Sequence, residues 1–401
     1  MGKGLFSNTQ LKIWKELSFR EKWYYIGTAI LKFLKKYYLT IIFVVAAIVS
    51  CFFVSKENQT VEHYVNACNF KTILCLFILM LTVAALMNIK FFKRLSAAIL
   101  RKIHSLRALV LILVFLPAVF AWFITHDVSL LTFIPFTVVA LEMAGQSKKL
   151  PKVLILQTLA CNLSGTISPI GTLQNIYLWD YFSISGVEFI KSCWPIAIAG
   201  YGLIFILCLI EKNVEITPLQ NVKRTLPIGK TVIYILMFIL AIIAIFDFVK
   251  TPRLYWIIVP IVCVVILICD RSAYRTVNYQ IPILFLAMFV LGANFQAIPA
   301  ISNFLQKIMS YEFFVVVGSS QVLNNTTAIV LLAPFTTNIP NFLIASAVAK
   351  FGSPLTSTAN QLVLTTYPSD LTRKVFVKWY LIAEVGFLAW LGGVALMVIY
   401  L

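Results

Sequence analysis

Long apolar stretches recur along the whole chain at the length of a membrane span. A helix needs about 20 apolar residues to cross the hydrocarbon core of a bilayer. Hydrophobic residues make up 61% of the 401 residues and charged residues only 12%, more apolar surface than a water-soluble fold of this size could hide. We expect continuous spans at 38–54, 71–88, 192–210, 231–249, 255–269, 281–295 and 376–400. The sequence therefore predicts an all-α polytopic membrane protein.

Four further apolar segments are interrupted by polar or helix-breaking residues. They are 107–143, 151–179, 311–337 and 341–366. A break at membrane depth is tolerated only where protein or a water-filled cavity surrounds it, because bare backbone polar groups are costly in hydrocarbon. These segments are therefore the first places to look for a functional site.

The distribution of basic residues sets the expected topology. The net charge of +18 is assigned to cytoplasmic loops and is not evidence for nucleic-acid binding. The segment 1–36 is predicted to be a cytoplasmic or interfacial amphipathic region. With the basic clusters inside, 107–143 starts and finishes in the cytoplasm and 311–337 starts and finishes outside. Each is then a re-entrant hairpin or a pair of tight spans, and the N-terminus is cytoplasmic and the C-terminus outside.

The two halves of the chain share markers in the same order. Residues 125–137 align with 324–336, and both stretches end in Pro-Phe-Thr. The spacing S-P-x5-N at 168–175 recurs at 353–360. Since the charge pattern gives corresponding elements opposite orientations, we expect two inverted repeats, each with a re-entrant hairpin and a broken transmembrane helix. The predicted boundaries are 37–211 for the first repeat, 212–229 for a cytoplasmic linker and 230–401 for the second repeat.

Small polar residues crowd both hairpin tips and both breaks. Their oxygens and the unwound carbonyls can coordinate a cation, whereas free N–H groups at a helix N-terminus favour an anion. Such residues also let helices pack closely, which is the commoner role of a single one. Their density beside a proline favours a site. The predicted substrate- or ion-binding residues are Thr125, His126, Asp127, Ser164, Thr166, Ser168, Thr172, Asn175, Asn324, Asn325, Thr326, Thr327, Ser353, Thr356, Ser357 and Asn360.

Asp127 is the acidic residue of most interest, because a carboxylate at membrane depth is costly and usually functional. It is either a cation ligand or proton carrier, or the N-cap of the second hairpin arm. His126 can titrate near neutral pH. Glu384, in the middle of the last span, is a weaker candidate.

The motif residues resemble the ion transporter superfamily. The segment 125–135, THDVSLLTFIP, is similar to the T-N-D-V-A-L-L-x-F-x-P stretch of its arsenite-permease-like branch. The segment 161–175 is similar to the N-x-G-G-x-x-x-P-x-G-x-x-x-N loop that follows. The superfamily also includes sodium–proton antiporters, citrate transporters and divalent anion–sodium symporters. His126 replaces the usual Asn, and the S-N-T tip motif of the symporters is absent as such.

This resemblance covers about residues 60 to 401 and carries implications for mechanism. It implies a substrate site between the hairpin tips, elevator-like movement of a core against a scaffold, and usually a homodimer. Together with the neutral polar motifs it favours a secondary active transporter of a small anion, such as citrate, a dicarboxylate or arsenite.

The coupling ion would be sodium or a proton, with no other cofactor and no metal beyond sodium. The alternative is a sodium–proton antiporter with Asp127 as the shared ligand. No sequence motif supports an enzyme. The expected surroundings are the lipid bilayer of a plasma (inner) membrane.

Overall fold

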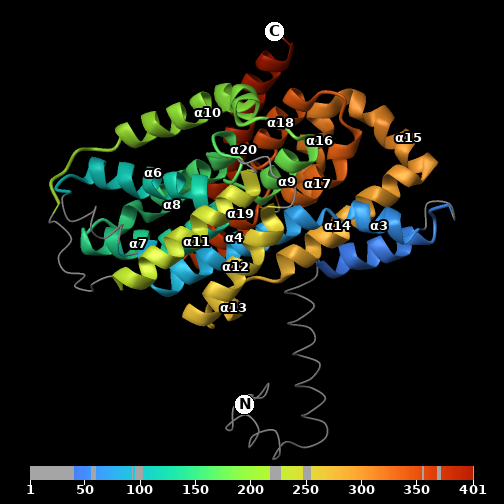
Figure 1. Ribbon diagram of the computed structural model, residues 1–401. Helices are drawn as coiled ribbons and strands as arrows, with labels where there is room; N and C mark the ends of the chain where they lie inside the picture. The colour runs from blue at the N-terminus through green and yellow to red at the C-terminus, as the bar shows by residue number, and fades with distance from the viewer. Residues whose placement is uncertain are drawn as a thin grey trace, which may run out of the picture.

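The computed structural model describes residues 40–55, 60–92, 94, 103–216, 227–246, 254–354, 356–367 and 372–400. Within them the fold is built from helices joined by short loops (Figure 1). The predicted segment 1–36 lies outside these residues, as does most of the linker 212–229. The principal helices are Thr40–Cys51, α3 Val61–Ala67, α4 Phe70–Asn88, α6 Leu106–Ile124, α7 His126–Met143, α8 Leu150–Asn162, α9 Leu173–Phe182, α10 Gly186–Leu209, α11 Ile228–Phe246, α12 Leu254–Cys269, α13 Ala273–Thr276, α14 Gln280–Ala297, α15 Pro299–Ile308, α16 Glu312–Val322, α17 Asn325–Leu332, α18 Ile339–Val348, α19 Thr358–Thr366 and α20 Arg373–Tyr400.

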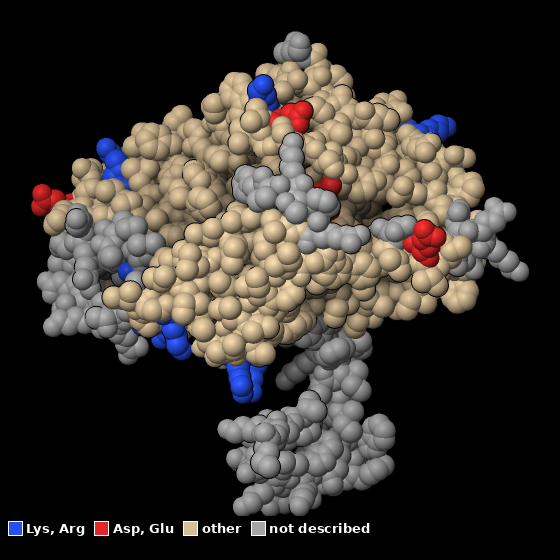
Figure 2. All heavy atoms as spheres, in the orientation of Figure 1, with Lys and Arg blue, Asp and Glu red and all other residues tan. Residues whose placement is uncertain are grey.

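The outer surface is that of a membrane protein. In the described part of the chain, seven helices are long and apolar enough to span a bilayer. Large apolar side chains face outward, and Phe52 and Ile268, for example, are 80% and 77% exposed. Figure 2 shows a broad uncharged expanse with only a few charged side chains on the visible face. The protein is therefore polytopic, and its helices agree closely with the predicted spans.

The first interrupted region consists of a helical hairpin followed by a broken helix. Ser105 caps α6 by accepting a hydrogen bond from the backbone N–H of Ala108. A single residue, Thr125, separates α6 from α7, and its φ of +71° allows the sharp reversal. Helix α8 packs against both arms of this hairpin and ends in a 3-10 turn, Leu163–Thr166, before α9 begins.

The second interrupted region repeats this order. Helices α16 and α17 form the hairpin, whose tip is Leu323–Asn324. The Asn324 side chain caps α17 by accepting from the N–H of Thr326. Helix α18 packs against α16 and is separated from α19 by residues 349–357. Figure 1 shows the two regions on opposite sides of the molecule, with α6–α8 on the left and α16–α18 on the right.

The remaining long helices form a frame around these two regions. Helix α4 packs against α11 and α12, and α14 packs against α17. Asn69 caps α4 and also donates to Asp180 at the end of α9 at 2.7 Å. Helix α14 runs between α13 and α15 (Figure 1) and so passes beside both the frame and the second hairpin.

Candidate functional site

Each hairpin tip is hydrogen-bonded to the break of its own half in an equivalent way. The backbone N–H of His126 donates to the carbonyl of Gly171 at 3.2 Å, and that of Asn325 donates to the carbonyl of Thr356 at 2.8 Å. In the alignment of the two halves, His126 corresponds to Asn325 and Gly171 to Thr356. The first residue of each second arm therefore donates to the carbonyl at the matching position of its own half.

Each tip also reaches the break of the other half. The Nε2 atom of His126 lies 3.2 Å from the Ser357 hydroxyl, and Thr326 donates to the Gln174 side chain at 3.0 Å. Between the breaks, Asn162 donates to Asn360 at 2.7 Å. Helix packing shows the same contacts between the halves. Helix α7 of the first half contacts α19 of the second, and α17 of the second contacts α9 of the first. The two halves therefore build one shared site.

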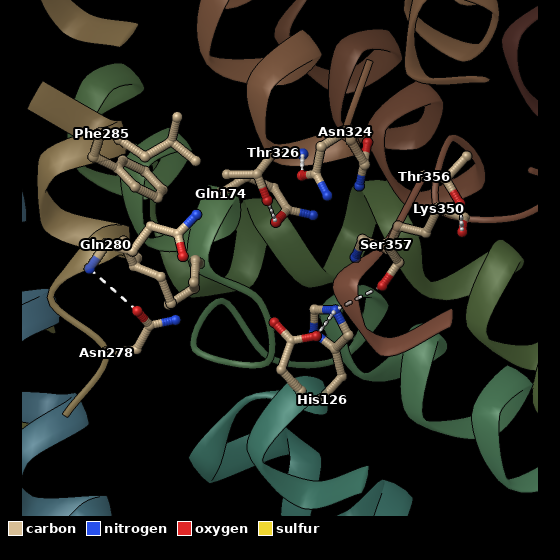
Figure 3. Close-up of a pocket in the computed structure, with 15 residues that line it drawn as sticks. His126, Gln174, Asn278, Gln280, Phe285, Asn324, Thr326, Lys350, Thr356 and Ser357 are labelled. Atoms are coloured by element: carbon tan, nitrogen blue, oxygen red, sulfur yellow. Dashed lines mark hydrogen bonds and ion pairs between the residues drawn. The ribbon is translucent and has the colours of Figure 1, made fainter. Parts of the chain in front are cut away.

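A cavity of about 200 Å³ lies where these tips and breaks meet (Figure 3). Its polar lining comes from both tips and from both broken helices, and α14 supplies a largely apolar wall. The lining residues are His126, Asp127, Leu173, Gln174, Asn278, Gln280, Ile281, Leu284, Phe285, Asn324, Asn325, Thr326, Lys350, Thr356 and Ser357.

Lys350 brings a buried cation to this cavity. It lies two residues after the end of α18, and only 1% of the residue is exposed. Among the described residues its ammonium has no hydrogen-bond partner, nor has the amide nitrogen of Asn325. Both residues line the cavity, and Figure 3 shows Lys350 on its wall. A buried ammonium without a hydrogen-bond partner is costly, so these two donors mark the place where a ligand with acceptor oxygens is favoured.

Gly165 in the first break makes room for this lysine. A Cβ added to Gly165 would collide with Nζ of Lys350 and would lie 2.9 Å from the amide nitrogen of Asn175. Asn175 in turn donates to the Gly165 carbonyl at 2.7 Å. The first break therefore forms a neutral, tightly packed wall beside the lysine of the second break.

Four helices present their N-terminal ends to the cavity. The first residues of α7, α9 and α17, and the N-cap residue of α19, all lie in its lining. The helix dipole makes each such end a partial positive charge. The ends and the lysine together favour negative charge in the cavity.

Asp127 and His126 form the acidic side of the site. Their side chains approach to 3.3 Å, with the carboxylate 26% and the imidazole 7% exposed. Thr125 is the N-cap of α7, so the interpretation of Asp127 as an N-cap is wrong, and its carboxylate instead faces the cavity from the first turn. No group of three or more metal-ligating side chains is present among the described residues.

The other predicted site residues lie behind the cavity wall and shape it. Within the first break, Ser164 donates to the Gly171 carbonyl and Thr166 to the Leu163 carbonyl. In the second break Thr356, which is itself in the lining, donates to the carbonyls of Lys350 and Ser353. Outside the lining are Thr125, Ser164, Thr166, Ser168, Thr172, Asn175, Thr327, Ser353 and Asn360.

Two side chains from outside the motifs support the second break. Glu384 in the middle of α20 is fully buried and accepts a hydrogen bond from the N–H of Gly352 at 3.3 Å. Gln321 of α16 accepts from the N–H of Ser353 and donates to the carbonyl of Phe351. Gly352 has φ +109°, a conformation that favours glycine. These contacts satisfy backbone groups that unwinding leaves without helical partners.

Sequence reasoning missed Lys350, Gln174 and the α14 residues of the lining. A signal existed for Lys350, since a lone lysine inside an apolar segment is itself a functional indication. The α14 residues carried no such signal, because their role depends on which face of the helix meets the hairpin.

Comparison with known proteins identifies the family. The family model described as citrate transporter matches residues 38–359, which is most of the chain. The chain belongs to the citrate transporter family. It is 27% identical over 300 residues to the uncharacterized transporter MJ0456 of Methanocaldococcus jannaschii, covering 74% of this chain and 80% of the relative. It is 24% identical over 345 residues to the inner membrane protein YbiR of Escherichia coli, covering 83% and 89%. This family consists of transporters rather than enzymes, and it lies within the superfamily that the motifs indicated.

Proposed function

We propose that this protein is a secondary active transporter of a small anion, a carboxylate or an oxyanion. The observation that carries the proposal is the buried ammonium of Lys350, which has no hydrogen-bond partner in the part of the chain that the structure describes, in a cavity that also receives four helix N-termini. An anion would neutralise the lysine and accept hydrogen bonds from Asn325 and the helix ends. The membership in the citrate transporter family supports a carboxylate.

The size of the cavity favours a small substrate. At about 200 Å³ it is smaller than the sites of drug-sized ligands, which occupy roughly 300 to 1,000 Å³. Citrate, dicarboxylates and arsenite are therefore the first candidates. Transport would be coupled to sodium or protons, with elevator-like movement of the hairpins and broken helices against the frame. The protein would act as a homodimer in a plasma (inner) membrane, with a cytoplasmic N-terminus and the C-terminus outside.

Uptake into proteoliposomes tests the proposal directly. Purified protein would be offered labelled citrate, succinate, sulfate and arsenite, with and without imposed sodium and pH gradients. The variant Lys350→Gln should lose about 10- to 100-fold in uptake efficiency, because a hydrogen bond to a charged group contributes about 1.5–3 kcal/mol. The matched control is Lys307→Gln, which removes an exposed lysine of α15. Uptake of none of the anions, or full-rate uptake by a folded Lys350→Gln variant, would contradict the proposal.

A sodium–proton antiporter remains the second candidate, and the His126–Asp127 pair is the observation that favours it. Asp127→Asn keeps the shape of the side chain but removes its charge and its titratable proton. We expect this variant to fold and to take up the anion without dependence on sodium or pH gradients. Sodium-driven proton flux in the absence of any anion would favour the antiporter instead.

A further inference from the structure

One face of α14 lines two separate cavities. Gln280, Ile281, Leu284 and Phe285 border the site cavity described above. Residues 288, 289, 292, 293 and 296 border a second cavity of about 260 Å³. Pairs of adjacent residues recur every four positions, so these residues form one stripe along the helix. The two cavities therefore follow each other along the same side of α14.

The opposite walls of the two cavities also belong to the same helices. Helix α9 contributes Leu173 and Gln174 to the site cavity, and Tyr177 and Tyr181, one and two turns further on, to the second cavity. Helix α17 passes from Asn325 in the first to Val330 in the second. Both cavities thus lie in a single seam between α9, α14 and α17.

Three aromatic side chains occupy the seam between the cavities. The rings of Tyr177 and Phe289 lie 5.1 Å apart, and those of Phe289 and Phe285 lie 5.8 Å apart. All three residues are at most 6% exposed. Beyond them the stripe becomes small and then polar, with Gly292, Ala293 and Gln296. The aromatic cluster therefore separates the polar site cavity from the second cavity, which has a similar volume.

The other end of the site cavity is bordered differently. A third cavity, of about 770 Å³, is lined by residues 275–280 and by the helix Thr40–Cys51, and it shares Asn278 and Gln280 with the site cavity. Asn278 and Gln280 are polar, and neither takes part in the ring contacts of the aromatic cluster. The site cavity is therefore continuous in its lining with the α13 end of α14 and closed by aromatic rings toward the α15 end.

We propose that the cavity between Tyr177 and Gln296 is the second access to the transport site, and that Tyr177, Phe285 and Phe289 form its closed gate. The anion leaves the site along the stripe of α14 when the elevator-like movement of α9 relative to α14 separates their rings. Gly292 and Ala293 leave room beyond the gate, and Gln280 and Gln296 offer polar groups at the two ends. This inference rests on the proposed transport function, because it assigns the route to and from the same site.

Thiol labelling of the full-length protein in oriented vesicles tests the gate without requiring transport. The background would carry serine or alanine at the eight native cysteines. Gln174→Cys reports on the site, Gln280→Cys on the α13 end and Gln296→Cys on the α15 end. A membrane-impermeant maleimide should modify positions 174 and 280 from the α13 side and position 296 from the α15 side.

Opening the gate should change the labelling of the site alone. Phe289→Ala removes two ring contacts. Because the loss of each contact should raise the equilibrium constant for opening the gate a few-fold, labelling of position 174 from the α15 side should rise about tenfold. Phe304→Ala, which truncates a 60% exposed phenylalanine of α15, is the matched control. If Phe289→Ala does not fold, the milder Phe289→Leu and Tyr177→Leu serve the same purpose.

The outcomes separate this inference from the proposed function. Equal labelling of position 174 from both sides before any gate substitution, or unchanged labelling in every folded gate variant, would overturn the gate. The expected labelling shift in a protein that transports no tested anion would support the route and reject the proposed substrate class.

Discussion

The two helix breaks occupy equivalent places in the chain but differ in their chemistry. The first is neutral and closes on itself, since Asn175 donates to Gly165 and Ser164 donates to Gly171. The second carries the buried lysine and is supported from outside by Glu384 and Gln321. Of the two breaks that border the cavity, only one therefore carries a charged side chain. One break provides the close-packed wall and the other provides the charged group.

Filling the gap in the first break should have the largest effect. Gly165→Ala places a methyl group against Nζ of Lys350 and against the Asn175 amide, which is held by its hydrogen bond to the Gly165 carbonyl. Overpacking of this kind costs about 1–3 kcal/mol, so we expect anion affinity to fall about 10- to 100-fold. Binding would be measured by isothermal titration calorimetry in detergent.

The control for this variant is Gly318→Ala on α16, where an added Cβ meets no atom within 4 Å. It should bind the anion as the unaltered protein does. If Gly165→Ala also binds normally, the first break does not confine the lysine, and the distinction between wall and charge fails.

Removing the support of the second break should have an intermediate effect. Glu384→Ala leaves the N–H of Gly352 without its acceptor, at a cost of about 1–3 kcal/mol for a buried donor. Uptake should fall about tenfold, and the midpoint of thermal unfolding should fall with it. Glu384→Gln keeps an acceptor oxygen and should retain the stability of the unaltered protein.

Glu142→Ala, which removes an exposed carboxylate at the end of α7, is the control for Glu384. Equal destabilisation by Glu384→Ala and Glu384→Gln would mean that the negative charge, and not the hydrogen bond, supports the break.

The contact between the breaks should have the smallest effect. A double-mutant cycle of Asn162→Ala and Asn360→Ala isolates their 2.7 Å hydrogen bond. We expect a coupling free energy of about 0.6 kcal/mol, the typical size of a side-chain hydrogen bond between membrane helices. Equilibrium unfolding in detergent would measure it, and a coupling of zero would mean that the two breaks fold independently.

Much of the fold could be predicted from the sequence, because backbone polar groups in hydrocarbon must be hydrogen-bonded within the protein and helices achieve this. The predicted span 71–88 is α4 at 70–88, and the predicted span 281–295 is α14 at 280–297. Each of the four interrupted segments is two helices with a break near its middle. The inverted relation of the halves, the homodimer and the membrane orientation stay predictions.

The candidate site could be predicted from the sequence only in part. The tips and breaks were predicted, and the structure brings both tips together with Thr356 and Ser357 of the second break in one cavity lining. Lys350 was not predicted, because the site was inferred from clusters of small polar residues and Lys350 is a single long basic side chain. The gate residues Phe285 and Phe289 look like ordinary apolar positions in the sequence, and only the packing of α14 against α9 and α17 gives them a place in the seam.

The exchange of contacts between the halves has a consequence for how such a chain could arise. His126 contacts Ser357 of the other half, and Thr326 contacts Gln174. A polypeptide of half this length would carry one tip and one break with no partner for either. It could assemble a comparable site only by pairing with a second copy of itself. Two identical copies could not carry Lys350 in one and Gly165 in the other, whereas two halves of one chain can.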